Sequence, residues 1–246
     1  MTGKTLIVSH VPILPSPLEP VTVHFKSIQE AINKAEDSDT ILVKAGTYSE
    51  NISISDKSLT IMGERGVGTV TIDGSNLGNT KPGFLIKRVH KAPIITIENV
   101  TIENFTNNKV SGQTYIGNGE GGGIYVSPKV TLTAKNCVIR DNNSSDGGAG
   151  IFIFAVALSN EADITVMTVD HCQITGNVSG GYGGGILNQG ISTIIYCTIK
   201  KNHAGGTGGG IQTMGHNSKI TIKNSVISEN SADNSGNITP CVDNCP

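Results

Sequence analysis

Apolar and polar residues alternate in short runs along most of the chain. In one such run Cys137 is followed two positions later by Ile139 and three positions after that by Asn142. Side chains of a β-strand alternate between its two faces, so this Cys and this Ile share one face, which we expect to be buried. The alternation predicts short β-strands rather than helices. The same run recurs from Cys172 and Cys197, and a fourth copy begins at Ser225.

The copies keep a constant internal spacing. From each Cys to the Ile that closes the next glycine run there are 14 positions, and these Ile residues are Ile151, Ile186 and Ile211. A period near 25 residues with strand-like alternation predicts a solenoid whose units are single coils of a parallel β-helix. The fold class is therefore all-β. We expect the glycines to bend the corners and the Asn residues to stack as a ladder, formed by Asn142, Asn177, Asn202 and Asn230.

A short helix is predicted ahead of the repeats, over residues 28–36. Ser27 and Glu30 form a capping box, and Ile28, Ala31 and Ile32 mark one apolar face. We expect this helix to shield the open end of the solenoid. Strands follow at Thr40–Val43 and at the inward pairs Ile52 with Ile54, Leu59 with Ile61 and Val70 with Ile72, with a turn at Ala45–Thr47. The expected organisation is a Pro-rich lead segment (1–24), the β-helix (25–230) and a C-terminal tail (231–246).

Two stretches resemble known β-helix proteins. The segments 25–33, 39–43, 45–52 and 59–63 resemble the opening of right-handed parallel β-helix proteins of the pectin-lyase-like superfamily. The glycine runs that end in Ile124, Ile186 and Ile211 resemble the repeats of polymorphic outer-membrane and other surface β-helix proteins. The resemblance implies a right-handed coil and an extracellular or cell-surface location.

Charge and composition exclude several classes of function. The chain has 18 basic and 20 acidic residues, so it lacks the positive field that attracts a nucleic acid. No run approaches the roughly 20 apolar residues that span a bilayer. The N-terminal stretch contains Leu6–Val8 but is interrupted by prolines from Pro12 onward, which is a poor match to a signal peptide.

The five cysteines fall into two groups. Cys137, Cys172 and Cys197 hold equivalent positions, so we expect an inward column, with reduced thiols favoured over disulfides. Cys241 and Cys245 could pair with each other in an oxidising compartment. We predict no metal site and no cofactor, since the inward column has no nearby His or carboxylate ligands.

Motifs of the pectin-active hydrolases and esterases are missing. The resemblance to pectin methylesterases implies Gln-Asp-Thr-Leu and Asp-Phe-Ile-Phe-Gly motifs, and 151–155 keeps only the aromatic part of the second. Polygalacturonase-type enzymes need Asp-Asp and Gly-His-Gly, and neither occurs. Inverting hydrolysis needs two carboxyl groups around a water, so that route is disfavoured.

A polysaccharide lyase is harder to exclude, because its base and its cation can come from unrelated coils. The outward positions that follow each inward Ile are Glu103, Arg140, Thr175, Lys200 and Ser228. Arg140 and Lys200, with Asp141 and His171 as further candidates and Lys201 and Tyr196 nearby, could bind a uronate. Ca²⁺ is implied only under this alternative. The competing interpretation is structural, with an ordinary Glu103–Arg140 ion pair and His171 as a turn residue.

The first hypothesis for function is a non-catalytic, secreted or cell-surface module that binds a glycan or a protein, as an adhesin or structural module would. The alternative is a lyase acting on uronate-containing polymers. Irregular loops usually carry sites, so we look to 109–118 and 155–163, where the repeat is interrupted. Because little sequence follows Asn230 to cover the last coil, we also expect end-to-end self-association through that coil.

Overall fold

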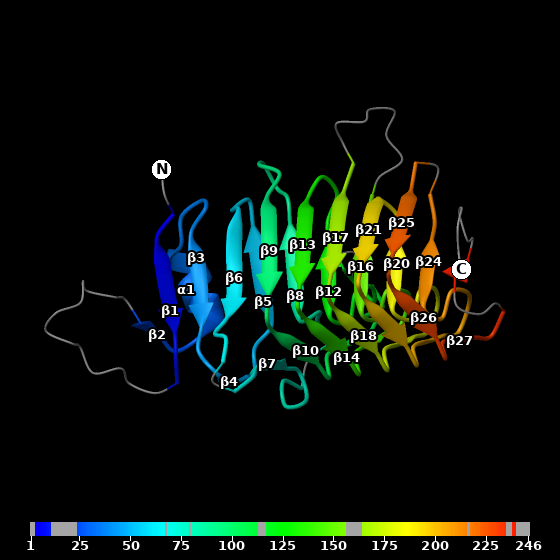
Figure 1. The fold of residues 1–246 in the computed structure, drawn as a ribbon, viewed down its shortest axis with the longest axis horizontal. Helices are drawn as coiled ribbons and strands as arrows, with labels where there is room; N and C mark the ends of the chain where they lie inside the picture. The colour runs from blue at the N-terminus through cyan, green and yellow to red at the C-terminus, as the bar shows by residue number, and fades with distance from the viewer. Residues whose placement is uncertain are drawn as a thin grey trace, which may run out of the picture.

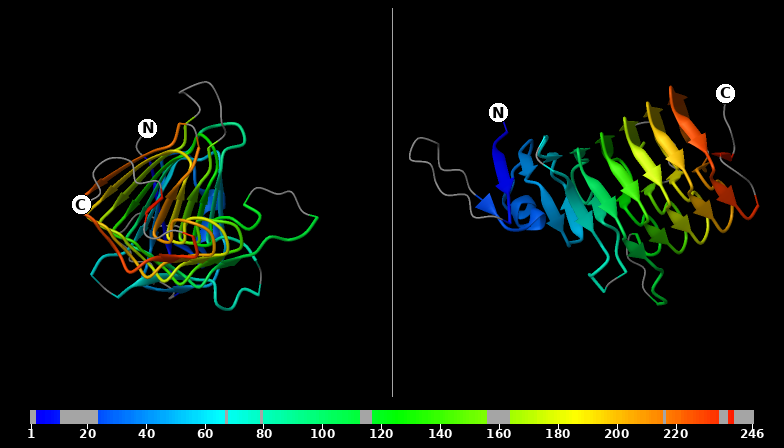
Figure 2. Two further views of the ribbon diagram at one scale, coloured as in Figure 1. Left: turned by 90° about the vertical axis from the view of Figure 1, so that its right-hand side faces the viewer. Right: turned by 60° about the horizontal axis from the view of Figure 1, so that its bottom comes forward.

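The chain winds into a solenoid of stacked coils. The computed structural model describes residues 3–10, 24–66, 68–78, 80–112, 117–155, 164–215, 217–234 and 238–239. Its strands form four sheets of nine, seven, five and seven members, and every strand pairing in the described part is parallel. Strands β1 and β27 lie near opposite ends, and the sheets surround a common interior when the solenoid is viewed along its axis (Figures 1 and 2). The predicted parallel β-helix is confirmed.

Sheet A is the longest, and it forms the front face in Figure 1. Within each strand buried and more exposed residues alternate, as in β3, so one face packs on the core and the other meets solvent. In spatial order its strands are β2 (His24–Phe25), β1 (Thr5–Val8), β3 (Thr40–Val43), β6 (Leu59–Gly63), β9 (Ile94–Glu98), β13 (Thr131–Lys135), β17 (Val166–Asp170), β21 (Ile191–Ile195) and β25 (Lys219–Lys223).

Sheet B follows sheet A around each coil, beyond a two-residue corner in the repeats. One turn prediction is wrong here: Gly46 and Thr47 belong to a strand rather than a turn, because they pair with Val70 and Thr71 of the next coil. The strands of sheet B are β4 (Gly46–Tyr48), β7 (Val70–Asp73), β10 (Thr101–Glu103), β14 (Val138–Arg140), β18 (Gln173–Thr175), β22 (Thr198–Lys200) and β26 (Val226–Ser228).

Sheets D and C complete each coil in the repeat region. Sheet D contains β11 (Thr106–Asn107), β15 (Asn143–Ser144), β19 (Val178–Ser179), β23 (His203–Ala204) and β27 (Ser231–Ala232). Sheet C contains β5 (Ile52–Ser55), β8 (Phe84–Lys87), β12 (Ile124–Val126), β16 (Ile151–Ile153), β20 (Ile186–Asn188), β24 (Ile211–Thr213) and β28 (Ile238–Thr239). Glycine-rich turns join D to C.

The predicted capping helix is present as α1 (Ile28–Lys34). The backbone N–H of Glu30 donates to Ser27 Oγ over 3.0 Å, which confirms the N-cap. The Glu50 carboxylate accepts two more free N–H groups of the first turn, from Ile28 at 2.7 Å and Gln29 at 2.9 Å. The apolar side of the helix is buried, and it packs against β1, β3 and β5.

Two inward columns confirm the sequence expectations. Cys137, Cys172 and Cys197 are buried and unbridged, and the backbone N–H of Cys137 lies 3.3 Å from Cys172 Sγ. The asparagines form the predicted ladder, in which Asn177 Nδ2 donates to Asn202 Oδ1 over 2.9 Å. At the tight corners of a solenoid, backbone N–H and C=O groups would otherwise lack hydrogen-bond partners, and columns of this kind supply them.

A second apolar cluster lies on the outer side of sheet C. Alternation predicts that Tyr125, Phe152 and Leu187 point to solvent, yet all three are buried. The glycine turns between sheets D and C lie directly against them: a Cβ placed on Gly147 would come within 2.5 Å of Leu187 Cδ2. The turns are therefore packed against the sheet, and glycine is required for this close approach.

Strands of the solenoid lie on both sides of the expected domain boundaries. β1 falls within 1–24 and pairs with β3, and β27 falls within 231–246 and pairs with β23. The Cys241–Cys245 pair and most of the 155–163 insertion lie outside the described residues. Among the described helices there is none with the length and hydropathy of a membrane span.

Candidate functional site

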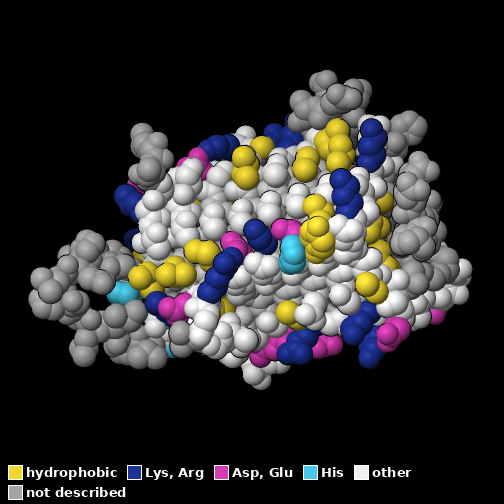
Figure 3. Space-filling view, in the orientation of Figure 1, with side chains coloured by type: hydrophobic (Ala, Val, Ile, Leu, Met, Phe, Trp, Pro, Cys, Tyr) yellow, Lys and Arg dark blue, Asp and Glu magenta, His cyan; other side chains and the backbone are white. Residues whose placement is uncertain are grey.

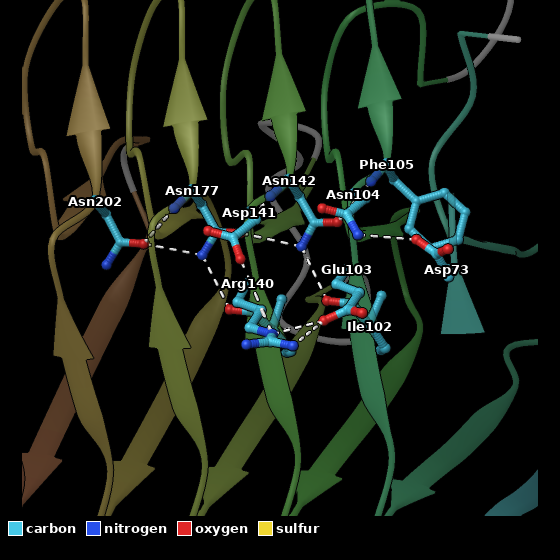
Figure 4. Close-up of polar contacts among 11 residues, drawn as sticks. Asp73, Ile102, Glu103, Asn104, Phe105, Arg140, Asp141, Asn142, Asn177 and Asn202 are labelled. Atoms are coloured by element: carbon cyan, nitrogen blue, oxygen red, sulfur yellow. Dashed lines mark hydrogen bonds and ion pairs between the residues drawn. The ribbon is translucent and has the colours of Figure 1, made fainter. Parts of the chain in front are cut away.

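The outward column of sheet B contains two of the predicted site residues. Arg140 on β14 donates from Nε to Glu103 Oε2 on β10 over 2.6 Å, and its guanidinium lies 3.9 Å from Asp141 Oδ2 (Figure 4). The predicted cross-coil pair is thus present. Because the Arg140 side chain is 47 % exposed, the pair contributes less than about 1 kcal/mol. Asp73, which the sequence analysis did not include, extends this column by one coil, since it pairs in register with Glu103.

Asp141 is a corner residue at the end of sheet B. Its φ of 54° places it in the left-handed region, where Asp and Asn are tolerated better than most residues. Its carboxylate lies over the next coil, where a Cβ on Gly176 would come within 2.4 Å of Asp141 Oδ1. The Asp141 carboxylate can therefore occupy this position only because Gly176 has no side chain.

Lys200 lies further along the same outward column. Strand β18 separates β22 from β14, so Lys200 and Arg140 are two coils apart, about 10 Å at the usual strand spacing. Lys200 has no ion pair with any other residue in the described part of the chain. Its neighbour Lys201 lies 3.9 Å from Glu229.

His171 sits at the opposite edge of sheet B. It occupies the corner between β17 and β18, four positions before Thr175, which is about 13 Å of strand. Its Nδ1 lies 2.6 Å from Asp170 Oδ1, and its ring is 4.8 Å from that of Tyr196 in the next coil. The structure thus brings Arg140 together with Asp141, and His171 together with Tyr196, but it separates the two pairs.

The row of residues between sheets A and B forms what we call the A–B corner. All of its members have positive φ, and they are Asn99, Asn136, His171, Tyr196 and Asn224. A positive φ is uncommon for an aromatic residue, and Tyr196 is also 54 % exposed. The Tyr196 ring therefore stands in solvent on a strained backbone, with His171 as its neighbour.

A groove opens onto the N-terminal end of this corner. It has a volume of about 300 Å³, near the lower limit for small-molecule sites. Arg65 in its wall forms an ion pair with Glu98. The residues lining it include Arg65, Thr69, Asn99, Thr101, Asn136 and Val138. Since Asn99 and Asn136 belong to both, the groove and the A–B corner form one continuous surface.

The chemistry of this surface suits a neutral polar ligand. Asn side chains both donate and accept hydrogen bonds, Arg65 donates, and the His171–Tyr196 rings present apolar faces. No cluster of three or more metal-ligating side chains occurs among the described residues. The side-chain oxygen atoms of the segment 141–146 do not gather around one point. Asn142 belongs to the ladder, and Asp146 pairs with Lys109 at 3.3 Å.

The interrupted coil before Gly121 builds a separate, partly buried cluster. Asn118 links the two sides of this loop, because its Oδ1 accepts the Val110 N–H at 2.7 Å. Burial, and then the Asp146 charge, raise the pKa of Glu120 above its usual value. Burial likewise raises the pKa of Tyr125. These shifts accompany packing of the loop on the outer side of sheet C, so we interpret the cluster as structural.

One surface feature was not predicted from the sequence. Sheet A carries a column of threonines on its outer face, and in the repeats each lies four positions before the inward Cys or Ser, as Thr133 does before Cys137. This fixed spacing was the available signal.

A family model described as "Right handed beta helix region" matches residues 47–194. The chain belongs to this family. The match spans more than half of the sequence and confirms the predicted hand of the coil. No curated protein matches the chain.

Solved structures similar to this β-helix include pectin methylesterases. One of them is a pectin methylesterase mutant in complex with a hexasaccharide. Its sequence is 17% identical to this one, the match covers 89% of this chain and 66% of that chain, and the TM-score is 0.48. The chain thus spans just under two thirds of that protein's length. Another is the pectin methylesterase from Aspergillus niger in penultimately deglycosylated form, 15% identical over 98% of this chain and 91% of that one, with a TM-score of 0.45.

Proposed function

We propose that this protein is a non-catalytic, secreted or cell-surface β-helix module that binds a glycan along the A–B corner. The observation that carries the proposal is the exposed His171–Tyr196 pair, which stands in line with the polar groove. Aromatic rings with one face in solvent provide an apolar platform for the C–H face of a sugar ring, while their edges remain polar.

The spacing of the corner favours an extended ligand. Its residues belong to successive coils, so they repeat about every 4.8 Å along the solenoid axis. A linear oligosaccharide lying along this axis would meet Asn99 and Asn136 at one end and the aromatic pair at the other. Rigid sheet ends hold these groups in place before binding, which lowers the entropy cost of association.

Separation of the charged candidates argues against a lyase. Elimination from a uronate needs a base and a carboxylate-neutralising cation at one sugar unit. His171 lies about 13 Å along the strand from the Arg140 edge. A lyase remains the second candidate, because the 2.6 Å contact with Asp170 orients the His171 imidazole beside the groove.

Binding to neutral and acidic oligosaccharides, measured by isothermal titration calorimetry, tests the proposal. We expect Tyr196→Ala to weaken binding about tenfold, as loss of about 1.4 kcal/mol of binding free energy requires. Tyr182→Ala is the matched control, since Tyr182 is similarly exposed at 45 % but lies in a D–C turn away from the corner. Equal affinity of both variants would place any glycan elsewhere, and no binding by the unaltered protein would overturn the proposal.

The lyase alternative has its own readout. Incubation with uronate polymers, with and without Ca²⁺, should leave the near-ultraviolet absorbance unchanged, because no unsaturated ends form. An absorbance rise that disappears in His171→Ala would show that the protein is a lyase and would overturn the proposal of a non-catalytic module.

A further inference from the structure

Eight threonines stand in register on the outer face of sheet A. Each strand pairing from β1 to β25 aligns one threonine with the next, without a gap. We call them the threonine column: Thr5, Thr40, Thr60, Thr96, Thr133, Thr168, Thr193 and Thr221. Seven strand intervals give it a length of about 34 Å.

A second column of β-branched residues runs beside it. Two positions earlier in the four strands β9, β13, β17 and β21 stand Ile94, Thr131, Val166 and Ile191. Ile94 is 61% exposed, so this column meets solvent as well. The two columns are about 7 Å apart, and a band without charged side chains crosses the front face in the space-filling view (Figure 3).

Strand formation alone does not require this uniformity. Threonine favours strands and pairs well across them, but Val, Ile and Tyr satisfy the same preference. On the other side of the threonine column, the same face of the same strands varies freely, through Met62, Glu98, Lys135, Asp170 and Ile195. One outward column is therefore chemically constant while its neighbour, on the same backbone, is not.

The hydroxyl groups of the threonine column are available to solvent. Within the described chain none of them donates to or accepts from another residue, and the threonines are half-buried or exposed. Each presents one methyl group and one hydroxyl group at a position fixed by the sheet, since a β-branched side chain is restricted at χ1. The result is a flat, uncharged lattice of methyl and hydroxyl groups.

We propose that this face binds crystalline water, the surface of ice. Parallel strands repeat about every 4.8 Å, close to the shortest repeat of the hexagonal ice lattice, and the distance of about 7 Å between columns is close to its longer repeat. Methyl groups order neighbouring water, and hydroxyl groups can accept or donate at lattice positions. Sugar chains fit this face less well, because neither column contains an aromatic residue.

Ice recrystallisation, followed by microscopy of a frozen protein solution, tests the proposal. The unaltered protein should keep crystals small, whereas the double variant T133K/T193K should need about tenfold more protein for the same effect, which corresponds to about 1.4 kcal/mol. The matched control is T71K/T198K, whose two threonines are outward and half-buried on sheet B and should retain full activity.

Folding and alternative partners are separated by further measurements. Far-ultraviolet circular dichroism verifies the fold of each variant, and T133V/T193V removes only hydroxyl groups, at nearly constant volume, with a partial loss of activity expected. Unchanged activity in both column variants, or coarse ice with the unaltered protein, overturns the proposal. If the face instead holds a second copy of the chain, sedimentation will show a dimer that only T133K/T193K dissociates, which also overturns it.

This inference is independent of glycan binding. Tyr196 lies at the A–B corner, outside both columns, so Tyr196→Ala should leave ice recrystallisation unchanged. Conversely, T133K/T193K should retain its affinity for oligosaccharide.

Discussion

Asn142 donates twice to one atom of Asn177, the side-chain oxygen Oδ1, from its backbone N–H at 3.1 Å and from its side-chain Nδ2 at 3.0 Å. The Asn177 amide in turn donates to the Ile139 carbonyl at 3.1 Å. Each rung of the ladder thus joins neighbouring coils through both its side chain and its backbone.

Replacing Asn177 with Ala should destabilise the protein. The substitution leaves two buried donors of Asn142 without acceptors, and each such group costs about 1–3 kcal/mol. We expect a lower midpoint in urea unfolding followed by circular dichroism.

Asn143→Ala is the control for the ladder, because the Asn143 side chain is exposed and points away from it. This variant should unfold within about 0.5 kcal/mol of the unaltered protein. Equal midpoints for the two variants would show that the ladder adds no stability.

Phe152→Ala tests whether the D–C turns are held by the outer apolar cluster. Phe152 is 1 % exposed although it points away from the interior of the solenoid, so its truncation should cost about 3–5 kcal/mol. Limited proteolysis should then cut the turns at 145–150 and 180–185 first. If Phe152→Ala is no more destabilising than Tyr182→Ala, the turns are held by their backbone hydrogen bonds alone.

Asp56 should make stability depend on acid pH. Its Oδ1 accepts the backbone N–H groups of Val89, His90 and Lys91 at 2.6, 2.9 and 3.1 Å. These bonds, with the Val89 N–H as the largest contribution, hold the pKa of Asp56 below its usual value. A lowered pKa means that the stabilisation is complete above the unfolded-state pKa of about 3.9 and is lost as the pH falls through the folded-state value.

Comparison of Asp56→Asn with the unaltered protein measures this contribution. The difference in unfolding free energy should be constant at neutral pH and shrink below about pH 4. A difference that persists unchanged at pH 2 would mean that the Asp56 charge is irrelevant.

Cys172 and Cys197 of the cysteine column should resist alkylation in the native state. Contact with the neighbouring Cys side chain, followed by burial, raises the pKa of the Cys172 and Cys197 thiols. Only a thiolate reacts readily, so iodoacetamide at pH 8 should label neither residue until urea unfolds the chain. Because these two thiols hold their protons more tightly when folded, the stability that they contribute should decrease as the pH rises above about 8.5. Site-resolved mass spectrometry checks the labelling, and rapid native labelling of Cys172 would contradict the buried column.

The buried side of the repeats could be predicted because each inward position has the same neighbours in every coil. Cys137 and Ile139 recur at fixed spacing, and a period of two assigns both to the interior without knowledge of the loops. Asn142 follows them at a corner, and its recurrence at the same place in each copy predicted the ladder. Tyr125 and Phe152 escaped prediction because the same rule places them in solvent. What buries them is a turn that folds back over the sheet, and alternation within a strand contains no information about that turn.

The candidate site was predictable only in part. The Glu103–Arg140 pair followed from the alignment of coils, and so did the turn position of His171. The distance between His171 and Arg140 could not be predicted in this way. One residue precedes a strand of sheet B and the other ends one, so they lie at opposite edges of the same sheet. The threonine column also had a signal, because Thr133, Thr168 and Thr193 each lie four positions before a Cys, but the Cys and glycine positions dominate the repeat.

The left-handed corners have a consequence for how this surface can change. Glycine adopts that backbone without strain, so at Asp141, His171 or Tyr196 a side chain is retained at some cost in stability. At these corners, therefore, a side chain that changes the surface chemistry also lowers the stability of the fold. A chain selected for stability alone would favour glycine at these corners.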